Sequence, residues 1–250
     1  MSKQDTTIVE DIVDDVAQVD IDDDEDDDDF PDPPPDQLYF PDDLLTNKGK
    51  RIIFNVIIYG SKPGDPLNDE RFGEHQRRCE LTLYPRLPHN RMTKDEITSF
   101  AKQFLFYQWP DFKHTQFWHC EICDKPTRIS QTTTMSWTRL DPPRVLSYIH
   151  FCCDIREGKC AETLREMEIA RRAMTPGAPP TPPVFEPDTH WYPFASSCAG
   201  CQEDTSSRPN LSHCGGCKLT RYCSETCQRA DWRRHKPFCK TKKTVKWIWD

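Results

Sequence analysis

The sequence predicts a disordered acidic tail, an α+β unit, a proline-rich linker and a small cysteine-rich unit, in that order. Three observations predict this organisation. Acidic residues crowd the N-terminus, hydrophobic residues follow strand and helix periods in the middle of the chain, and cysteines lie in close pairs near the C-terminus. With 30% charged residues, the 250-residue chain as a whole cannot be one well-packed core.

Residues 1–43 are the predicted disordered tail. The first 36 residues hold sixteen Asp or Glu and one Lys, a net charge of -15, whereas the other 214 residues carry +7. Like charges and prolines prevent packing, so the stretch DIDDDEDDDDFPDPPPD should stay disordered. Two interpretations stay open: a solvating tail, or an electrostatic competitor that keeps nucleic acid from the basic body.

Residues 44–174 are the predicted α+β unit. Residues 51–59 are rich in β-branched and aromatic side chains, which predicts a buried strand. Residues 79–84 alternate between polar and apolar and predict a second strand, and residues 144–151 predict a third. Residues 160–174 predict a closing helix.

A further helix is predicted to begin at a capping box made by Thr93 and Glu96. Behind it, apolar residues recur at the i, i+3, i+4, i+7 and i+8 positions of one helix face. These are Ile97, Phe100, Ala101, Phe104 and Leu105. The pair Trp109-Pro110 should end the helix, because proline lacks a backbone donor. The apolar face therefore belongs to the core of the α+β unit.

Residues 175–193 are the predicted linker. The segment TPGAPPTPPVFEPDTHWYP contains seven prolines and shows no helix or strand period. Such a segment is extended and partly polyproline II. The cysteine-rich unit spans residues 194–240, and residues 241–250 are interpreted as a basic and aromatic tail.

The chain has thirteen cysteines, and their chemistry depends on the compartment. The acidic N-terminus is no secretory signal, and the longest apolar stretch, residues 52–58, is too short to span a bilayer. We therefore expect an intracellular protein of the cytoplasm, the nucleus or both, with no membrane partner. Thiols stay reduced there, so paired cysteines indicate metal more often than disulfides.

Eight potential ligands form four close pairs near the C-terminus. The pairs are Cys198-x2-Cys201, Cys214-x2-Cys217, Cys223-x3-Cys227 and His235-x3-Cys239. Tetrahedral zinc takes four nitrogen or sulfur ligands, so eight make two sites with no open position, which are structural rather than catalytic. The alternatives are unligated thiols or a disulfide cluster. Spacing alone does not choose between sequential and interleaved pairing.

Residues 198–239 resemble the MYND-type zinc finger. All eight ligand positions are filled, and Tyr222-Cys223-Ser224, Cys227-Gln228, Asp231-Trp232 and His235-Lys236 fall where that family carries them. The resemblance implies interleaved pairing. One zinc would be held by Cys198, Cys201, Cys223 and Cys227, and the other by Cys214, Cys217, His235 and Cys239.

The resemblance also implies a partner. MYND fingers are known for binding proline-rich peptides along the edge of a short hairpin, and Gln228 and Trp232 match positions that contact the peptide. An indole face suits proline, because both are rigid. In the alternative interpretation, Trp232 simply packs between the two zinc sites.

A second cysteine group lies upstream. Cys120-x2-Cys123 is followed by Cys152 and Cys153 as additional candidate metal ligands, and by Cys160. Neighbours on a strand point to opposite faces, so one of Cys152 and Cys153 should be core. FWHCEICDKPTRIS and DPPRVLSYIHFCCD also resemble the upstream region of uncharacterised fungal proteins that end in a MYND finger. A third zinc and a cluster of reduced, buried thiols both stay open.

The sequence therefore predicts a zinc-binding adaptor that is not an enzyme and that recognises proline-rich segments of other proteins. One alternative is a nucleic-acid-associated regulatory protein, since basic residues gather between Arg229 and Lys243. Another is a methyltransferase-related protein, since MYND fingers also accompany SET-type methyltransferases. The chain carries no Asn-His-Ser-Cys-like cofactor motif and no HExxH or G-x-S-x-G motif.

Overall fold

The computed structural model describes four stretches of the chain, residues 43–65, 72–153, 157–174 and 193–249. The predictions of a disordered tail at 1–43 and a linker at 175–193 fall almost entirely outside these residues. All described residues belong to one compact unit. The predicted α+β architecture is confirmed.

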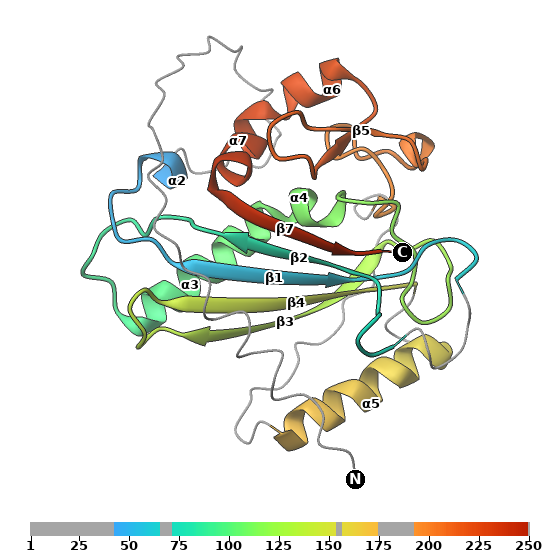
Figure 1. Ribbon diagram of the computed structural model, residues 1–250, viewed down its shortest axis with the longest axis horizontal. Coiled ribbons are helices and arrows are strands. Elements are labelled where there is room, and N and C mark those ends of the chain that lie inside the picture. The colour runs from blue at the N-terminus through green and yellow to red at the C-terminus, as the bar shows by residue number, and fades with distance from the viewer. Residues whose placement is uncertain (1–42, 66–71, 154–156, 175–192, 250) are drawn as a thin grey trace. The chain divides into compact units, whose positions relative to one another are not determined.

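A five-stranded mixed sheet forms the centre of this unit, in the order β3-β4-β1-β2-β7 (Figure 1). Its strands are β1 (Ile53–Tyr59), β2 (Arg78–Leu83), β3 (Ile129–Trp137), β4 (Arg144–Cys152) and β7 (Lys242–Ile248). The central strand β1 runs parallel to its neighbour β4, and all other neighbouring strands run antiparallel. The three strands predicted from the sequence are β1, β2 and β4.

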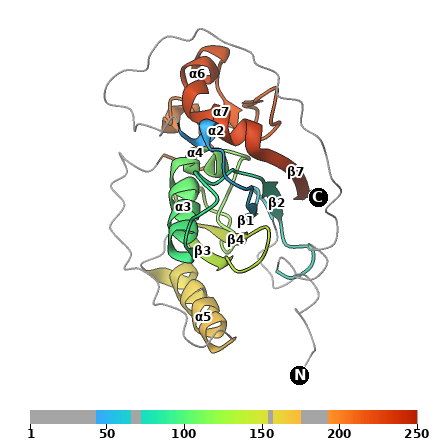
Figure 2. The same cartoon turned by 90° about the vertical axis from the view of Figure 1, so that its left-hand side faces the viewer.

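Helices α3 (Lys94–Tyr107) and α4 (Trp109–Lys113) cover one face of the sheet (Figure 2). The predicted capping box is present, with Thr93 N–H donating to Glu96 Oε2 at 2.7 Å. All five predicted core residues of α3 are buried. Phe104 meets Phe54 of β1 edge to face, with ring centroids 5.5 Å apart. The unit also contains a short α2 (Asp43–Thr46) and a long α5 (Gly158–Met174).

The cysteine-rich segment adds a hairpin and two helices to the same unit. Its elements are the 3₁₀ turn η2 (Asp204–Ser206), β5 (Ser212–His213), β6 (Arg221–Tyr222), α6 (Glu225–Ala230) and α7 (Trp232–Thr241). Phe238 of α7 packs edge to face on Phe112 of α4, with ring centroids 5.3 Å apart. Buried residues of the sheet, of α3 and α4 and of this segment form one continuous hydrophobic cluster.

Residues 241–249 are not a tail, so the prediction of a basic and aromatic tail is wrong for them. Lys242–Ile248 follows α7 directly and pairs antiparallel with β2, from Leu83 opposite Lys242 to Arg78 opposite Ile248. The ring of Trp249 packs on the buried ring of Trp118, with ring centroids 5.0 Å apart. The segment KKTVKWI carries too many lysines to show a strand pattern, and its partner strand lies more than 150 residues earlier in the chain. Local sequence therefore could not identify this strand.

Strand β3 also escaped sequence analysis, because ISQTTTMSW shows no alternation of polar and apolar residues. None of its nine residues is buried, as expected for a strand at the edge of a sheet. None of the helices in the described stretches combines the length and the apolar character that crossing a bilayer requires.

Candidate metal centre

The structure brings the eight C-terminal ligand candidates together in two groups, and the grouping is interleaved. Within each group, all donor atoms lie within 4.8 Å of one another. One group joins Cys198, Cys201, Cys223 and Cys227, and the other joins Cys214, Cys217, His235 and Cys239.

The spacing of the donor atoms suits tetrahedral zinc. A Zn–S bond of about 2.3 Å places two sulfurs of a tetrahedron about 3.8 Å apart. In the first group, Cys223 Sγ lies 3.3 Å from Cys227 Sγ and 4.0 Å from Cys201 Sγ. In the second group, Cys217 Sγ lies 3.6 Å from His235 Nε2. Both groups can therefore hold a zinc ion, and neither leaves a coordination position for a substrate.

The turns that carry the two C-x2-C pairs have the same backbone conformation. The residue after the second cysteine, Gln202 or Lys218, has a positive φ, of 53° and 60° respectively. Its N–H donates to the carbonyl of the first cysteine, 2.9 Å away in both turns. A positive φ is unfavourable for a residue with a Cβ, so it persists only where the surroundings hold it. The turn points both thiols of a pair to one side.

Two glycines let the remaining ligands approach these turns. A Cβ on Gly216 would lie 2.9 Å from Cys239 Sγ, and a Cβ on Gly200 would lie 2.7 Å from the carbonyl oxygen of Cys227. Real Cβ atoms do not come so close, so both positions require glycine.

The Gly216→Ala substitution is expected to weaken the second zinc site, because the added methyl group displaces Cys239. We expect a loss of stability of about 1–3 kcal/mol, typical of overpacking, and faster zinc release to a chelator. Gly215→Ala is the matched control, because a Cβ there meets nothing within 4 Å. Equal zinc release rates in both variants would contradict the close-approach argument.

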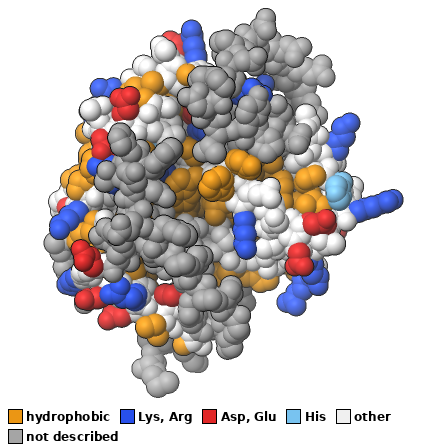
Figure 3. All heavy atoms as spheres, turned by 180° about the vertical axis from the view of Figure 1, so that it is seen from behind, with side chains coloured by type: hydrophobic (Ala, Val, Ile, Leu, Met, Phe, Trp, Pro, Cys, Tyr) orange, Lys and Arg blue, Asp and Glu red, His pale blue; other side chains and the backbone are white. Residues whose placement is uncertain are grey.

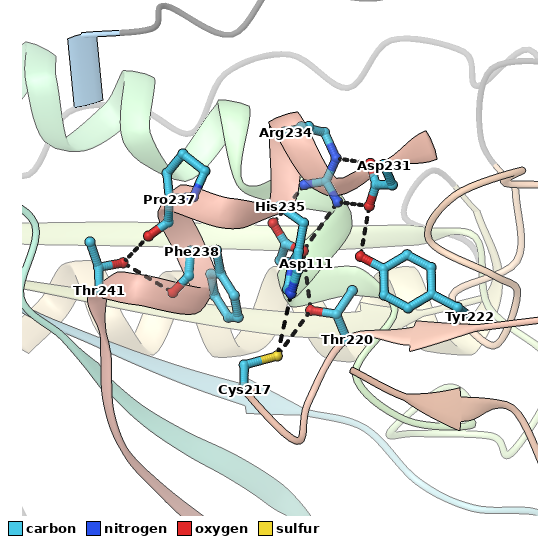
Figure 4. A network of polar contacts seen from close by, with 10 residues as sticks. All are labelled: Asp111, Cys217, Thr220, Tyr222, Asp231, Arg234, His235, Pro237, Phe238 and Thr241. Carbon is cyan, nitrogen blue, oxygen red and sulfur yellow. Dashed lines mark hydrogen bonds and ion pairs between the residues drawn. The ribbon is translucent and has the colours of Figure 1, made fainter. Parts of the chain in front are cut away.

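A ligand of the second group is oriented by a residue of the α+β part. His235 is fully buried, and its Nδ1 lies 2.6 Å from Asp111 Oδ1 (Figure 4). Because a carboxylate accepts, Nδ1 carries the proton, and Nε2 is left to face the thiols. Metal-bound histidines are held in this way by a carboxylate behind them. Asp111 lies in α4, far from the finger in sequence, and no sequence signal marks its role.

Asp111 is also the centre of a charged network. Arg234 donates to both carboxylate oxygens of Asp111, at 2.6 and 3.1 Å, and Thr220 donates to Oδ1 at 3.1 Å. Arg234 also binds Asp231, which accepts from the Tyr222 hydroxyl at 2.8 Å. The chain thus satisfies a fully buried carboxylate from two separate segments, the residue before β6 and helix α7.

The network favours the charged forms of Asp111 and His235 through their pKa values. Burial alone raises the pKa of Asp111, but the neighbouring charges of Arg234 and His235 outweigh burial and hold it below its ordinary value. Burial lowers the pKa of His235, but Asp111 reverses this and raises it to about 12. In the metal-free protein His235 is therefore doubly protonated. A zinc ion must displace the proton from Nε2, while Nδ1 keeps its bond to Asp111.

The upstream cysteines also converge, with one difference from the predicted set. Cys120, Cys123 and Cys153 lie together with Cys160, whereas Cys152 is not in the group. Cys152 ends β4 with its side chain fully buried, but strand alternation places it on the face opposite Ile149 and Phe151, where it packs in a small cluster with Cys120 and Cys160. His150 is bound to Glu121, with Nδ1 3.0 Å from Oε1.

The two predicted peptide contacts both lie on finger helices. Gln228 is in α6 and Trp232 is the first residue of α7, and both are half-buried. The Trp232 ring lies 5.9 Å from the ring of His235. Its Nε1 has no hydrogen-bond partner in the structure as described. The indole therefore packs on the second ligand group with its Nε1 buried, and only part of its surface is exposed.

The fold and the two ligand groups define the class of this segment, a zinc finger with interleaved ligand pairs built onto an α+β sheet. Residues 198–239 match the family model described as the MYND finger, so this segment is a MYND finger. MYND fingers are protein-interaction modules, so residues 198–239 form a zinc-binding module of that general kind. No solved structure matches the chain.

Three curated proteins illustrate the similarity, which covers the same segment. SET domain-containing protein 14 of Caenorhabditis elegans is 46% identical over 44 residues, 18% of this chain and 10% of that protein. Deformed epidermal autoregulatory factor 1 of Drosophila melanogaster is 44% identical over 45 residues, 18% and 7% of the two chains. SET domain and MYND-type zinc finger protein 6 of Schizosaccharomyces pombe is 41% identical over 44 residues, 18% and 8%. The chain thus spans a tenth or less of these relatives.

Proposed function

We propose that the protein is an intracellular adaptor without enzymatic activity, whose finger binds proline-rich segments of partner proteins. The observation that carries the proposal is the exposed edge of the finger hairpin. Both residues of β5 are exposed and both residues of β6 are buried. Within the described residues, β5 pairs only with β6, so its outer edge is open to an added strand.

An extended peptide can add to such an edge through its backbone, while side-chain pockets provide specificity. Trp232 supports this, because the ligand histidine His235 holds the indole from one side and so limits its motion. A rigid aromatic surface binds proline with little loss of conformational entropy. Gln228, half-exposed on α6, can donate to the carbonyl groups of a peptide.

The nucleic-acid alternative finds less support, because the basic residues of the finger are partly engaged. Arg234 is bound to Asp111 and Asp231, Arg229 pairs with Glu225 at 2.5 Å, and Lys242 donates to a backbone carbonyl. On the face drawn in Figure 3, Lys and Arg are interspersed with Asp and Glu rather than gathered in one patch. A nucleic-acid site needs a continuous basic surface.

The Trp232→Ala substitution in the full chain is expected to weaken binding of a proline-rich peptide strongly while both finger zincs stay bound. Aromatic hot spots at interfaces cost about 2 kcal/mol or more when truncated, roughly a thirtyfold loss of affinity. Titration calorimetry and zinc analysis on the same samples measure both quantities. Gln228→Ala should weaken binding less.

Arg229→Ala is the matched control, since Arg229 lies on the same helix as Gln228 and forms an exposed ion pair with Glu225. It should bind the peptide like the wild type. Undiminished binding by Trp232→Ala would remove the proposed groove. Methyl transfer from S-adenosylmethionine above background would instead favour the enzymatic alternative.

A further inference from the structure

The turn that carries Cys120 and Cys123 has the backbone form of the two finger turns. Three residues other than glycine have a positive φ in the described stretches, namely Gln202, Lys218 and Asp124. Asp124, with φ of 62°, directly follows Cys123, and its N–H donates to the carbonyl of Cys120 at 3.2 Å. Each of the three thus follows the second cysteine of a C-x2-C pair and closes the same hydrogen bond.

The backbone conformation that the three turns share needs a common physical cause. A positive φ is unfavourable for Gln and Lys and better tolerated by Asp, and local sequence has no common feature that produces it in all three. The feature shared by the three turns is the pair of thiols that each points to one side. The upstream turn is therefore a third ligand-presenting turn.

The thiols complete a tetrahedral set. The donor atoms of Cys120, Cys123, Cys153 and Cys160 lie within 4.8 Å of one another, as in the finger groups. Cys123 Sγ lies 3.3 Å from Cys153 Sγ, and Cys120 Sγ lies 3.9 Å from Cys160 Sγ. These separations bracket the roughly 3.8 Å expected between sulfurs on one zinc. They are far longer than the bond of about 2.05 Å in a disulfide.

The fourth ligand comes from a helix with few buried apolar side chains among those described. Along α5, the buried side chains among those described are Cys160, Ala161 and Leu164, all within its first turns. Met167 and Ile169 are 37% and 68% exposed. Leu164 and Cys160 pack in a small cluster made mostly of the cysteines themselves. So little apolar contact would not fix a 17-residue helix in water without a further attachment.

We propose that Cys120, Cys123, Cys153 and Cys160 hold a third zinc ion, a closed structural site that fastens α5 to the end of β4. The ion would provide the attachment that the few buried apolar side chains of α5 do not. It joins a turn that follows α4, the residue after β4 and the first turn of α5. Because four thiolates fill the coordination sphere, this zinc takes no part in chemistry.

Elemental analysis and native mass spectrometry of the full-length protein, purified with reductant, test the proposal. We expect three zincs per wild-type chain, one for each ligand group. Cys160→Ser should hold two, and hydrogen exchange should show α5 losing protection while β5 and α6 keep theirs. Cys123→Ser, at a half-exposed ligand, should behave in the same way.

Cys152→Ala is the matched control, because Cys152 is buried beside the group but does not belong to it. It should retain three zincs. Two zincs in the wild type would overturn the proposal. The four thiols would then be free, or the protein mass would be lower by two hydrogens because Cys123 and Cys153 form a disulfide. Three zincs in both Cys160→Ser and Cys123→Ser would overturn it equally.

Discussion

Removal of zinc by a chelator is expected to unfold the finger together with the adjoining part of the sheet, in one transition. A structural zinc contributes about 10–16 kcal/mol in isolated finger peptides, as much as the whole stability of a typical domain. The finger shares its hydrophobic cluster with the sheet, and α7 continues directly into β7. Loss of the finger therefore exposes β2 as well.

Hydrogen exchange before and after chelation measures this coupling. Protection should fall in β7, β2 and α4 along with α6 and α7, and zinc but not magnesium should restore it. Acid should act in the same direction, because protons compete with zinc for the thiolates. Undisturbed protection in β2 and α4 of the zinc-free protein would show instead that the finger folds as an independent module.

The Asp111→Ala substitution is expected to weaken the finger, although Asp111 lies outside it. The change leaves the Nδ1–H of His235 buried without its carboxylate and leaves Arg234 with Asp231 alone. Removal of one partner from a buried ion pair costs about 3–5 kcal/mol. Loss of the carboxylate behind a ligand histidine lowers metal affinity about 10–100-fold. Thermal unfolding and competition with a chromophoric chelator measure the two effects.

Two variants sharpen this experiment. Asp111→Asn keeps an acceptor oxygen but removes the charge, so it should fall between the wild type and Asp111→Ala. Asp95→Ala removes an exposed acid from the first turn of α3 and should cost at most about 1 kcal/mol, with zinc affinity unchanged. Wild-type zinc affinity in Asp111→Ala would show that the finger orients His235 without help.

Sequence alone predicted the parts of this protein whose signals are local. The capping box and the apolar face of α3 lie within one helix, and residues 51–59 of the first strand form one β-branched run. The ligand pairs are visible because metal chemistry demands particular residue types at short spacing. The pairing between them came from the MYND resemblance, since several pairings fit the same spacing.

The tertiary structure decided everything that depends on distant partners. The lysine-rich segment Lys242–Ile248 becomes a strand because β2 offers it an edge. Asp111 becomes the support of His235 because α4 packs under the finger. Cys160 joins the upstream group because the first turn of α5 lies against the turn that carries Cys120. The tertiary structure also merged the predicted α+β unit and finger into one body. Such contacts join residues far apart in the chain, and no local pattern of polarity or spacing records which distant surface a residue will meet.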